Sequence, residues 1–402
     1  MRRIEPNILL LPVHRNIHRV ASEGAWAINI MQSVTVSFKN VISVVGEIDN
    51  KVIERLQSPV KNSLISLHAG YDYSFKSDLF FYGKLFITGL KIIRNKKIDI
   101  IHHVMPLGIG AGFSPIFMFV HRQKKIIGPL LYPYSTPDAK SFIEGFKFNY
   151  GRDYLKIFGP FFTFLFVMTL RSSDVIIMDS VETLGIIEKI YPKVQRKDVF
   201  IIPGGGIDAT RFAPIDQKSD LDGYTLGVLS YHTKNKNIDL ILRAYSKLKR
   251  PNITLRIGGV GPQTEKLKIL SKELGIEEKV SFFGDIAAED VPNFYHSIDV
   301  QIVATTGPHT LNSSIQEALM SGCAIIAPDL NTDSGHIILP YGILVGDKSP
   351  DGFAKAIDEI TSDGGKIKEM KDNARKYAEE NLSTTVVGRT LERIYNDAFD
   401  AK

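Results

Sequence analysis

Short apolar runs, separated by longer amphipathic stretches, recur along the first half of the chain. Apolar runs bounded by polar residues are typical of buried strands. The stretch 82–93 instead has its apolar positions on one face and predicts a helix that ends in basic residues. Strands that alternate with helices at this spacing predict a parallel sheet covered on both faces. The strands predicted in this half are 7–13, 41–45, 98–101, 126–131, 175–178 and 199–202.

The same alternation starts again after a glycine-rich turn, IPGGGIDATRFAP at 202–214, and a polar stretch at 215–224. A restarted series predicts a second doubly wound domain, and 402 residues are enough for two domains of about 150–200 residues. We place them at 1–203 and 204–384, with a C-terminal helix within 385–402 that packs back on the first domain. The second series contains predicted strands at 226–229, 253–257, 280–283, 299–303 and 323–327 and helices at 238–248, 264–274 and 291–296.

The stretch TTGPHTLNSSIQEALMSGCAIIAPD, at 305–329, predicts a loop, a short helix that opens near residues 312–314, and a buried strand. The N-terminus of a helix offers unpaired N–H groups and a positive dipole end, which together suit a pyrophosphate. Glu317 lies one turn inside this helix, where its carboxylate could bind a ribose. The alternative is local, because Ser314-x-x-Glu317 is also a capping box in which the carboxylate satisfies a backbone donor.

Composition places the chain among ordinary globular proteins, with 44% hydrophobic and 23% charged residues. The single cysteine, Cys323, excludes an internal disulfide and fits a reducing compartment. It stands in an apolar run, so we expect it in the core. The first residues, MRRIEPNILLLPVHRN, lack the apolar segment of a signal peptide, and we therefore expect a cytoplasmic protein.

The charge balance is mildly basic, with 49 Lys and Arg against 44 Asp and Glu, which is too little to indicate a nucleic-acid partner. Basic residues do cluster at 91–97 and 121–125. The Phe-rich segment 155–170 is nearly free of charge and too short to span a bilayer. It predicts a buried helix or, alternatively, a surface segment that enters an acidic membrane beside the basic clusters. The alternative would place the protein at the inner face of the cell membrane. The sequence predicts no oligomeric state.

Four segments of the second half, taken in order, resemble the retaining GT-B glycosyltransferases of the large family four. The likeness in the first half is weaker and rests on DIIHH, GPLLYP and VIIMDS. The resemblance implies two Rossmann-like domains that face each other across a cleft, the second holding a nucleotide-diphosphate sugar and the first an acceptor. The four segments are IPGGGIDATRFAP; the run from IGGVG to QIVAT; SIQEALMSGCAIIAP; and MKDNARKYAEENLS.

The activity that the resemblance implies is transfer of the sugar to a hydroxyl of a glycan, glycolipid or lipid-linked acceptor, with retention of configuration and front-face attack. It implies no metal and no cofactor besides the donor. In the family's paired-glutamate motif, Glu317 is the ribose-binding member, and His309 stands where the first Glu is expected. Lys236 matches the phosphate-binding Lys, whereas Tyr231 stands in place of an Arg.

The remaining residues implied at the donor lie in two loops and at one helix start. Gly259 and Gly261 follow a predicted strand and either let the backbone approach the donor or only form a turn. Asp285 and Ile286 stand where relatives clasp the base through backbone groups, which leave no side-chain signature of the base. The helix start contributes Leu311, Asn312, Ser313 and Ser314, with Asn312 in place of a small glycine.

On the acceptor side, His103 follows a predicted strand and stands near the position of a family histidine; we count it with His309 and Lys236 as catalytic. Gly24, His14 and Arg15 are candidate acceptor contacts in the first domain. For His103 a structural role at the strand end is an equal alternative. Because His309, Tyr231 and Asn312 depart from the family pattern, the rival hypothesis is an inactive nucleotide-sugar-binding protein that serves as scaffold or partner of an active transferase.

Overall fold

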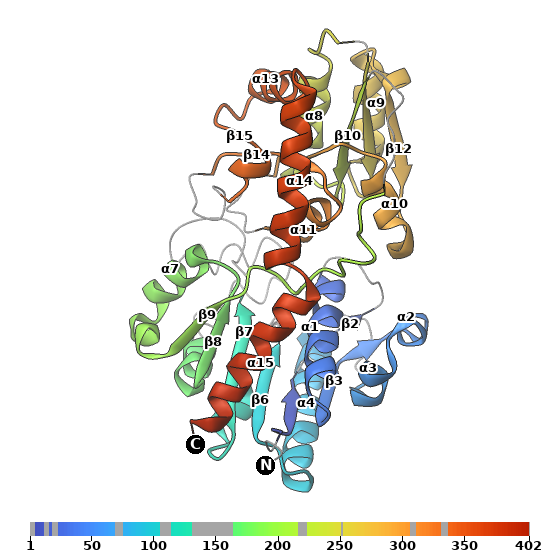
Figure 1. Ribbon diagram of the computed structural model, residues 1–402. Helices are drawn as coiled ribbons and strands as arrows, with labels where there is room; N and C mark the ends of the chain where they lie inside the picture. Colours follow the sequence, from blue (N-terminus) through green and yellow to red (C-terminus); the bar gives the residue numbers. More distant parts are fainter. Residues whose placement is uncertain are drawn as a thin grey trace. The chain divides into compact units, whose positions relative to one another are not determined.

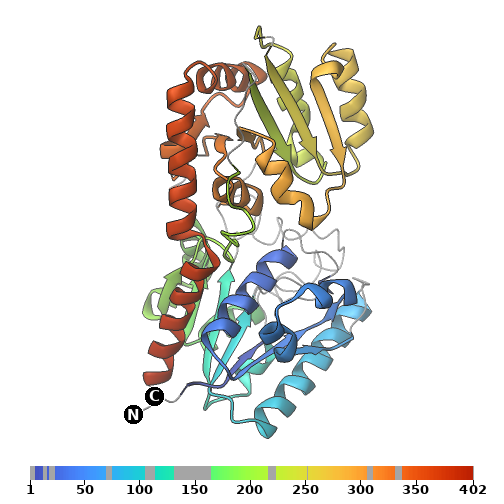
Figure 2. The same ribbon diagram turned by 45° about the vertical axis from the view of Figure 1, so that its right-hand side comes forward.

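The chain folds into two compact units, each described by itself. Unit 1 consists of Met1–Gly206 with Thr384–Lys402, and unit 2 is Ile207–Ser383 (Figures 1 and 2). The sequence predicted domain boundaries after residues 203 and 384, whereas the units change after residues 206 and 383. The computed structural model describes residues 5–11, 16–17, 23–68, 75–104, 114–130, 164–215, 223–250, 252–305, 311–330 and 337–401.

Unit 1 is built on a seven-stranded sheet in the order β5-β3-β1-β6-β7-β8-β9, in which every neighbouring pair is parallel. From β1 the chain runs outward to β5 and then returns to β6, which confirms the doubly wound prediction. Its strands are β1 (Ile8–Leu10), β3 (Val41–Val45), β5 (Leu64–Ser66), β6 (Ile100–Val104), β7 (Lys124–Leu130), β8 (Val175–Met178) and β9 (Asp198–Ile201), and a separate pair is formed by β2 (Asn16–Ile17) and β4 (Glu47–Ile48).

Helices cover both faces of this sheet because successive strand residues point to opposite sides. Ile8 and Leu10 of β1 belong to the core under one set of helices, and Leu9 and Leu11 to the core under the other. The first set is α1 (Glu23–Ser37), α2 (Asn50–Arg55), α3 (Ser58–Ser63) and α15 (Thr384–Asp400); the second is α4 (Phe75–Asn95), η1 (Pro115–Met118), the helical residues 164–172, α7 (Val181–Ile190) and η2 (Pro192–Arg196).

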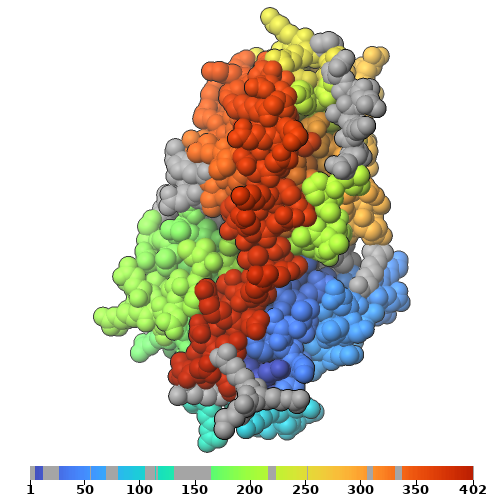
Figure 3. Space-filling view, in the orientation of Figure 1, coloured from blue at the N-terminus to red at the C-terminus, as the bar shows by residue number. Residues whose placement is uncertain are grey.

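The C-terminal helix α15 belongs to unit 1, as predicted, and lies beside α1 (Figures 1 and 3). The hydroxyl of Ser33 donates to the carbonyl of Thr384 at 3.2 Å where α15 begins. The chain enters and leaves unit 2 through neighbouring segments. Ile207 pairs with Ser383, and its N–H donates to the carbonyl of Leu382 at 2.7 Å.

Unit 2 contains a second parallel sheet, in the order β12-β11-β10-β13-β14-β15. The predicted strands correspond to five of these six, and β15 was not predicted. The strands are β10 (Tyr224–Leu229), β11 (Ile253–Gly258), β12 (Val280–Gly284), β13 (Val300–Ile302), β14 (Ala324–Pro328) and β15 (Gly342–Val345).

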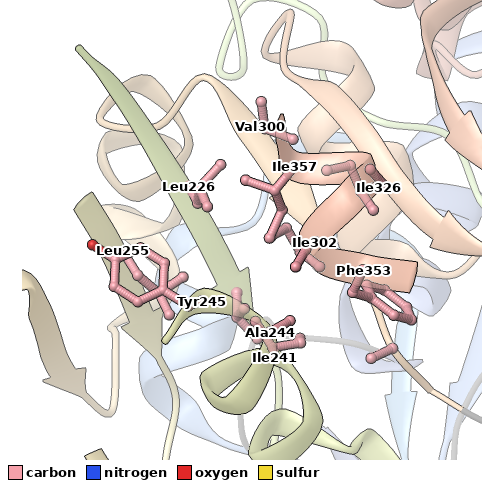
Figure 4. Close-up of a cluster of buried hydrophobic side chains, with 14 of the residues drawn as sticks. Leu226, Ile241, Ala244, Tyr245, Leu255, Val300, Ile302, Ile326, Phe353 and Ile357 are labelled. Carbon is pink, nitrogen blue, oxygen red and sulfur yellow. The ribbon is translucent and has the colours of Figure 1, made fainter. Parts of the chain in front are cut away.

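Each face of the second sheet has its own core. On one face, Val300 and Ile302 of β13 and Ile326 of β14 meet Phe353 and Ile357 (Figure 4). The helices on this face are α8 (Ile238–Tyr245), α9 (Thr264–Glu273) and α13 (Pro350–Ile360), and Ile367 and Met370 from the first half of the helix at 364–381 join the same core. The other face carries α10 (Val291–His296), α11 (Ser313–Met320) and α14 (Gly364–Asn381), and short turns complete the unit at η3 (Lys234–Lys236), η4 (Glu277–Lys279), η5 (Ala288–Asp290) and η6 (Leu339–Tyr341).

The prediction for β6 is wrong at its carboxyl end. The sequence indicated a strand at 98–101 followed by a polar pair, whereas β6 extends through His102 and His103, both of which are buried. Burial of His102 is possible because both of its ring nitrogens have partners. Nδ1 lies 2.5 Å from the Tyr395 hydroxyl and Nε2 lies 2.8 Å from the Gly128 carbonyl oxygen.

Two further predictions concern apolar segments. Cys323 is buried, as predicted, and burial raises the pKa of its thiol to about 12. Of the segment 155–170, residues 155–163 lie outside the described residues. The rest is helical, and it buries Phe166 while Phe164 is exposed. Among the described residues, no helix combines the length and the apolar character needed to cross a bilayer.

Candidate functional site

The candidate site lies where four neighbouring strands of the unit 2 sheet end. Ligands of doubly wound sheets bind at the carboxyl ends of the strands, so the loops after β10, β11, β12 and β13 are the relevant ones. These strands are neighbours in the sheet, and their loops are hydrogen-bonded to one another. His232 N–H donates to the Val260 carbonyl and Gln263 N–H to the His232 carbonyl, both at 3.0 Å, and Gly259 N–H donates to the Gly284 carbonyl at 2.7 Å.

The two predicted donor-site glycines have a structural reason to be glycine. Gly259 has φ +108°, and a Cβ there would lie 2.0 Å from the Ser230 carbonyl oxygen. A Cβ at Gly261 would lie 2.6 Å from the His232 carbonyl oxygen. Close packing between the loops after β10 and β11 therefore requires both glycines, whether or not a ligand is bound.

A histidine and a threonine fasten the same two loops together. The Nδ1 of His232 lies 2.9 Å from Oγ1 of Thr264, and this hydroxyl oxygen accepts the Gly261 N–H at 2.9 Å. Burial lowers the pKa of His232, so its imidazole is neutral near pH 7. Its Nε2 is buried and forms no hydrogen bond of normal geometry within the described residues, although the Gly258 backbone partly opposes the lowering of the pKa. We refer to His232, Thr264 and Gly261 as the clasp; sequence reasoning did not find it.

Lys236 lies at the end of η3 with its side chain half-buried. Burial lowers the pKa of its ammonium group, and none of the described residues forms an ion pair with it. The next residue, Asn237, has φ 47° and donates from Nδ2 to the Ala304 carbonyl at 2.9 Å. This bond holds the loop after β10 against the end of β13. Tyr231, in the same loop, is exposed.

The helix α11 begins as predicted, but Ser314 is not its capping residue. Asn312 is the N-cap, and its Oδ1 accepts the Ile315 N–H at 3.1 Å and the Ser314 hydroxyl at 2.7 Å. The N–H groups of Ser313 and Ser314 have no acceptor among the described residues. Asn312 therefore acts as a cap at the position where a small glycine was expected, and Leu311 before it is buried.

Glu317 does not form the capping box. Its Oε2 lies 3.1 Å from the hydroxyl of Tyr295, which also lies 3.1 Å from the Ser314 carbonyl oxygen. Burial raises the pKa of Glu317 to about 7, although the Tyr295 hydrogen bond and the positive charge of Arg211 oppose the shift. Glu317 is only partly exposed, so its carboxyl group exchanges a proton near neutral pH in a largely apolar setting.

The other predicted residues are dispersed. Asp285 is exposed and Ile286 is half-buried in the loop after β12, and the Ile286 side chain packs over Gly258. His103 belongs to unit 1. There its ring lies edge-on to Phe117, with centroids 6.2 Å apart, and burial lowers the pKa of its imidazole to about 3.

Four predicted positions remain, and the structure describes only one of them. His309, His14 and Arg15 lie outside the described residues, and Gly24 is in α1. Across the described ranges no group of three or more His, Cys, Asp or Glu side chains could hold a metal ion.

The comparisons with known proteins bear on the same part of the chain. Residues 212–377 match the model of the family glycosyl transferases group 1. A curated relative, an uncharacterised glycosyltransferase of Methanocaldococcus jannaschii, is 28% identical over 170 residues, which is 42% of this chain and 43% of the relative. The aligned parts cover 33–43% of the first curated relatives, so less than half of their length.

Solved structures are similar over nearly the whole chain. Sucrose-phosphate synthase from Thermosynechococcus elongatus has a TM-score of 0.73 at 18% identity, covering 99% of this chain and 100% of that one. Anabaena HepE in complex with UDP-glucose has a TM-score of 0.67 at 16% identity, covering 97% and 99%. At these identities the likeness shows the fold alone. The chain thus has the GT-B fold of two parallel α/β domains, and its residues 212–377 resemble glycosyl transferases group 1.

Proposed function

We propose that the protein is a retaining glycosyltransferase that moves a sugar from a nucleotide-diphosphate donor to an acceptor hydroxyl. The observation that carries the proposal is that two groups suited to an anion lie in the loops that follow the strands of unit 2. A half-buried ammonium group without an ion-pair partner among the described residues, Lys236, and unpaired N–H groups at the start of α11 both favour an anion. The match of residues 212–377 to glycosyl transferases group 1 supports the same reading.

The donor diphosphate would bind the N–H groups of Ser313 and Ser314 and the ammonium group of Lys236. Glu317 would bind the ribose hydroxyls, because an ionised carboxylate accepts two hydrogen bonds from neighbouring hydroxyls. Backbone groups at Asp285 and Ile286 would contact the base. The clasp would keep the loop that carries Lys236 in place, since it joins that loop to the glycine loop after β11.

Transfer requires that the bond between the sugar and the donor phosphate breaks while negative charge accumulates on the diphosphate. Lys236 and the dipole of α11 would stabilise this charge, so the proposal needs no metal ion. The acceptor oxygen would attack on the face that the diphosphate leaves. Its proton would pass to a phosphate oxygen of the leaving group, which gives a nucleoside diphosphate and a product of unchanged configuration.

We assign the acceptor, a glycan, glycolipid or lipid-linked sugar, to unit 1, with Gly24, His14 and Arg15 as candidate contacts. His103 would act as a neutral imidazole, because its lowered pKa excludes a cation at pH 7. We further propose that His309, which takes the place of the family's first Glu, contacts the transferred sugar.

The test is to incubate the purified protein with UDP-, GDP- and ADP-sugars. A bound donor should raise the free energy of unfolding by about 2.7 kcal/mol at a hundredfold excess over its dissociation constant. Release of nucleoside diphosphate, with and without EDTA, measures turnover and metal dependence, and NMR of the anomeric proton reports the configuration. Affinity without turnover would favour the inactive scaffold, and no affinity for any of the three would overturn the proposal.

A further inference from the structure

A stripe of alternating apolar and basic side chains runs along the solvent side of α4 in unit 1. Phe80, Lys84, Ile87, Lys91 and Arg94 follow one another at spacings of three and four residues and therefore share one helix face. Phe80 is 54% and Ile87 68% exposed, and Lys91 and Arg94 are also exposed. In Figure 2, α4 (light blue) lies at the outside of its unit.

The opposite face of α4 already supplies the core. Phe81, Leu85 and Ile92 are buried against the unit 1 sheet. Folding of unit 1 therefore does not account for Phe80 and Ile87, because their side chains remain in water. Two large apolar side chains on a polar helix face cost solubility, and exposed apolar groups rimmed by polar ones mark interaction surfaces.

A neighbouring segment adds a third exposed apolar side chain. Phe119, just after η1, is 61% exposed, and its ring lies edge-on to Phe86 of α4 with centroids 5.3 Å apart. The turn is fixed against the helix because Ile116 fills the space above Gly89, where a Cβ would lie 2.2 Å from its Cδ1. Phe119 is therefore held beside the stripe.

The charge of this surface has one sign. Neither residues 80–97 nor residues 119–122 contain an Asp or a Glu. The Nζ of Lys84 lies 4.5 Å from the centre of the Phe80 ring and donates to the Leu67 carbonyl at 3.0 Å, so this half-buried lysine adds positive charge beside Phe80. The basic side chains of the surface are Lys84, Lys91, Arg94, Lys96, Lys97 and Arg122.

We propose that this surface, formed by the α4 stripe, residues 96–97 and 119–122, binds the face of an anionic lipid bilayer. Phe80, Ile87 and Phe119 enter the boundary between headgroups and acyl chains, and the cations contact lipid phosphates. The single sign of charge fits a fluid anionic headgroup layer better than a protein surface, where charges of both signs are mixed. Ile87 offers no ring for base stacking, so RNA fits less well. The inference does not rest on the proposed transferase activity.

The experiment is co-sedimentation of the full chain with vesicles of phosphatidylcholine alone or mixed with an equal amount of phosphatidylglycerol. We expect binding to the mixed vesicles only, weakened by salt because headgroup attraction is screened. Lys91→Gln with Arg94→Gln should lower the partition coefficient by roughly fivefold per cation removed. Phe80→Ser with Ile87→Ser should lower it on the order of tenfold or more.

Matched controls come from unit 2, where Ile269 on α9 is 56% exposed and Lys272 on the same helix is exposed. Ile269→Ser with Lys272→Gln should leave vesicle binding unchanged. Equal melting temperatures would show that the variants are folded. The proposal is overturned if the wild-type chain stays in the supernatant, if the stripe variants sediment like wild type, or if the chain binds only single-stranded RNA or a second copy of itself.

Discussion

The hydroxyl of Tyr295 lies 3.1 Å from the carboxyl group of Glu317, and the two side chains meet inside unit 2 between α10 and α11. Tyr295 has a single hydroxyl proton, and the Ser314 carbonyl lies equally close to it. An ionised Glu317 accepts the hydrogen bond that the Tyr295 hydroxyl donates. A protonated Glu317 can instead donate to Tyr295 while Tyr295 donates to Ser314.

Replacement of Glu317 by Gln should change stability in a pH-dependent way. The pKa of Glu317 is raised from 4.5 to about 7 in the folded chain, so the folded state binds the extra proton. Stability contributed by this group is present below pH 4.5 and lost as the pH rises to about 7. Glu317→Gln should therefore be more stable than wild type at pH 8, by about 2 kcal/mol after allowance for partial exposure, and equal at pH 4.

Urea unfolding at both pH values measures this difference. The exposed Glu273 of α9 provides the control, since Glu273→Gln should show no such divergence. A Glu317→Gln variant with the same stability advantage at both pH values would contradict the assignment.

Replacement of Lys236 by Met keeps the length of the side chain and removes its charge. We expect the free energy of unfolding to stay within about 0.5 kcal/mol or to rise, because a half-buried cation without an ion-pair partner in the described structure is lost. Donor affinity should fall on the order of tenfold, from the loss of a charged hydrogen bond worth about 1.5–3 kcal/mol. Isothermal titration with the preferred donor checks this, with Lys272→Met as control. Unchanged donor affinity would remove Lys236 from the site.

Replacement of Thr264 by Val breaks the clasp while keeping the shape of the side chain. Two partly buried partners, the Gly261 N–H and Nδ1 of His232, lose their hydrogen bonds. We expect a loss of about 1–3 kcal/mol in the free energy of unfolding and a raised KM for the donor. Thr264→Ser retains the hydroxyl and should behave like wild type. Equal behaviour of the Val and Ser variants would show that the clasp contributes nothing.

Replacement of Gly259 by Ala should be severe, since its φ is +108° and the Ser230 carbonyl oxygen occupies the space of the new methyl group. Gly275 offers a matched control, because its φ is +65° and nothing lies within 4 Å of an added Cβ. We expect Gly275→Ala to cost about 1 kcal/mol from backbone strain alone and Gly259→Ala to cost more than about 3 kcal/mol. Denaturant midpoints measure both, and similar costs would argue against the close approach of the loops.

Replacement of Tyr395 by Phe removes the partner of Nδ1 in His102 and leaves that buried nitrogen unpaired. The expected loss is about 1–3 kcal/mol in unit 1. Burial lowers the pKa of His102 from 6.5 to about 4, so its contribution to stability is present above pH 6.5 and lost as the pH falls toward 4. Hydrogen exchange in β6 and α15 measures the loss, and unchanged protection of both elements would contradict it.

The sequence predicts best those elements whose apolar residues are consecutive. The strand at 175–178 has the predicted bounds, because its four apolar side chains are all buried. The strand at 41–45 also has the predicted bounds, although the buried Ser43 interrupts its apolar run. The strand at 98–101 was cut short because His102 is polar. The hydrogen-bond partner of His102, Tyr395, lies 293 residues away, so the sequence near His102 does not indicate that this histidine can be buried.

In the candidate site, too, the sequence predicted local features but not contacts between elements. The start of α11 follows from local capping chemistry, although Asn312 and not Ser314 caps it. The partner of Glu317 could not be predicted, because Tyr295 comes from another helix, 22 residues earlier. The role of Gly259 likewise depends on a backbone carbonyl of a different loop. Contacts between elements decide such roles, and a single sequence does not record them.

The pairing of Ile207 with Ser383 makes unit 2 an insertion in the chain of unit 1. The two ends of the insertion are neighbours, and so are the two ends that it leaves behind, since a Cβ on Gly206 would lie 2.9 Å from the Cα of Thr384. Unit 1 could therefore be closed by a short peptide from 206 to 384, and residues 207–383 could be excised together. Removal of the last residues of the chain, in contrast, would strip a helix from the core of the first unit while leaving the candidate donor site untouched.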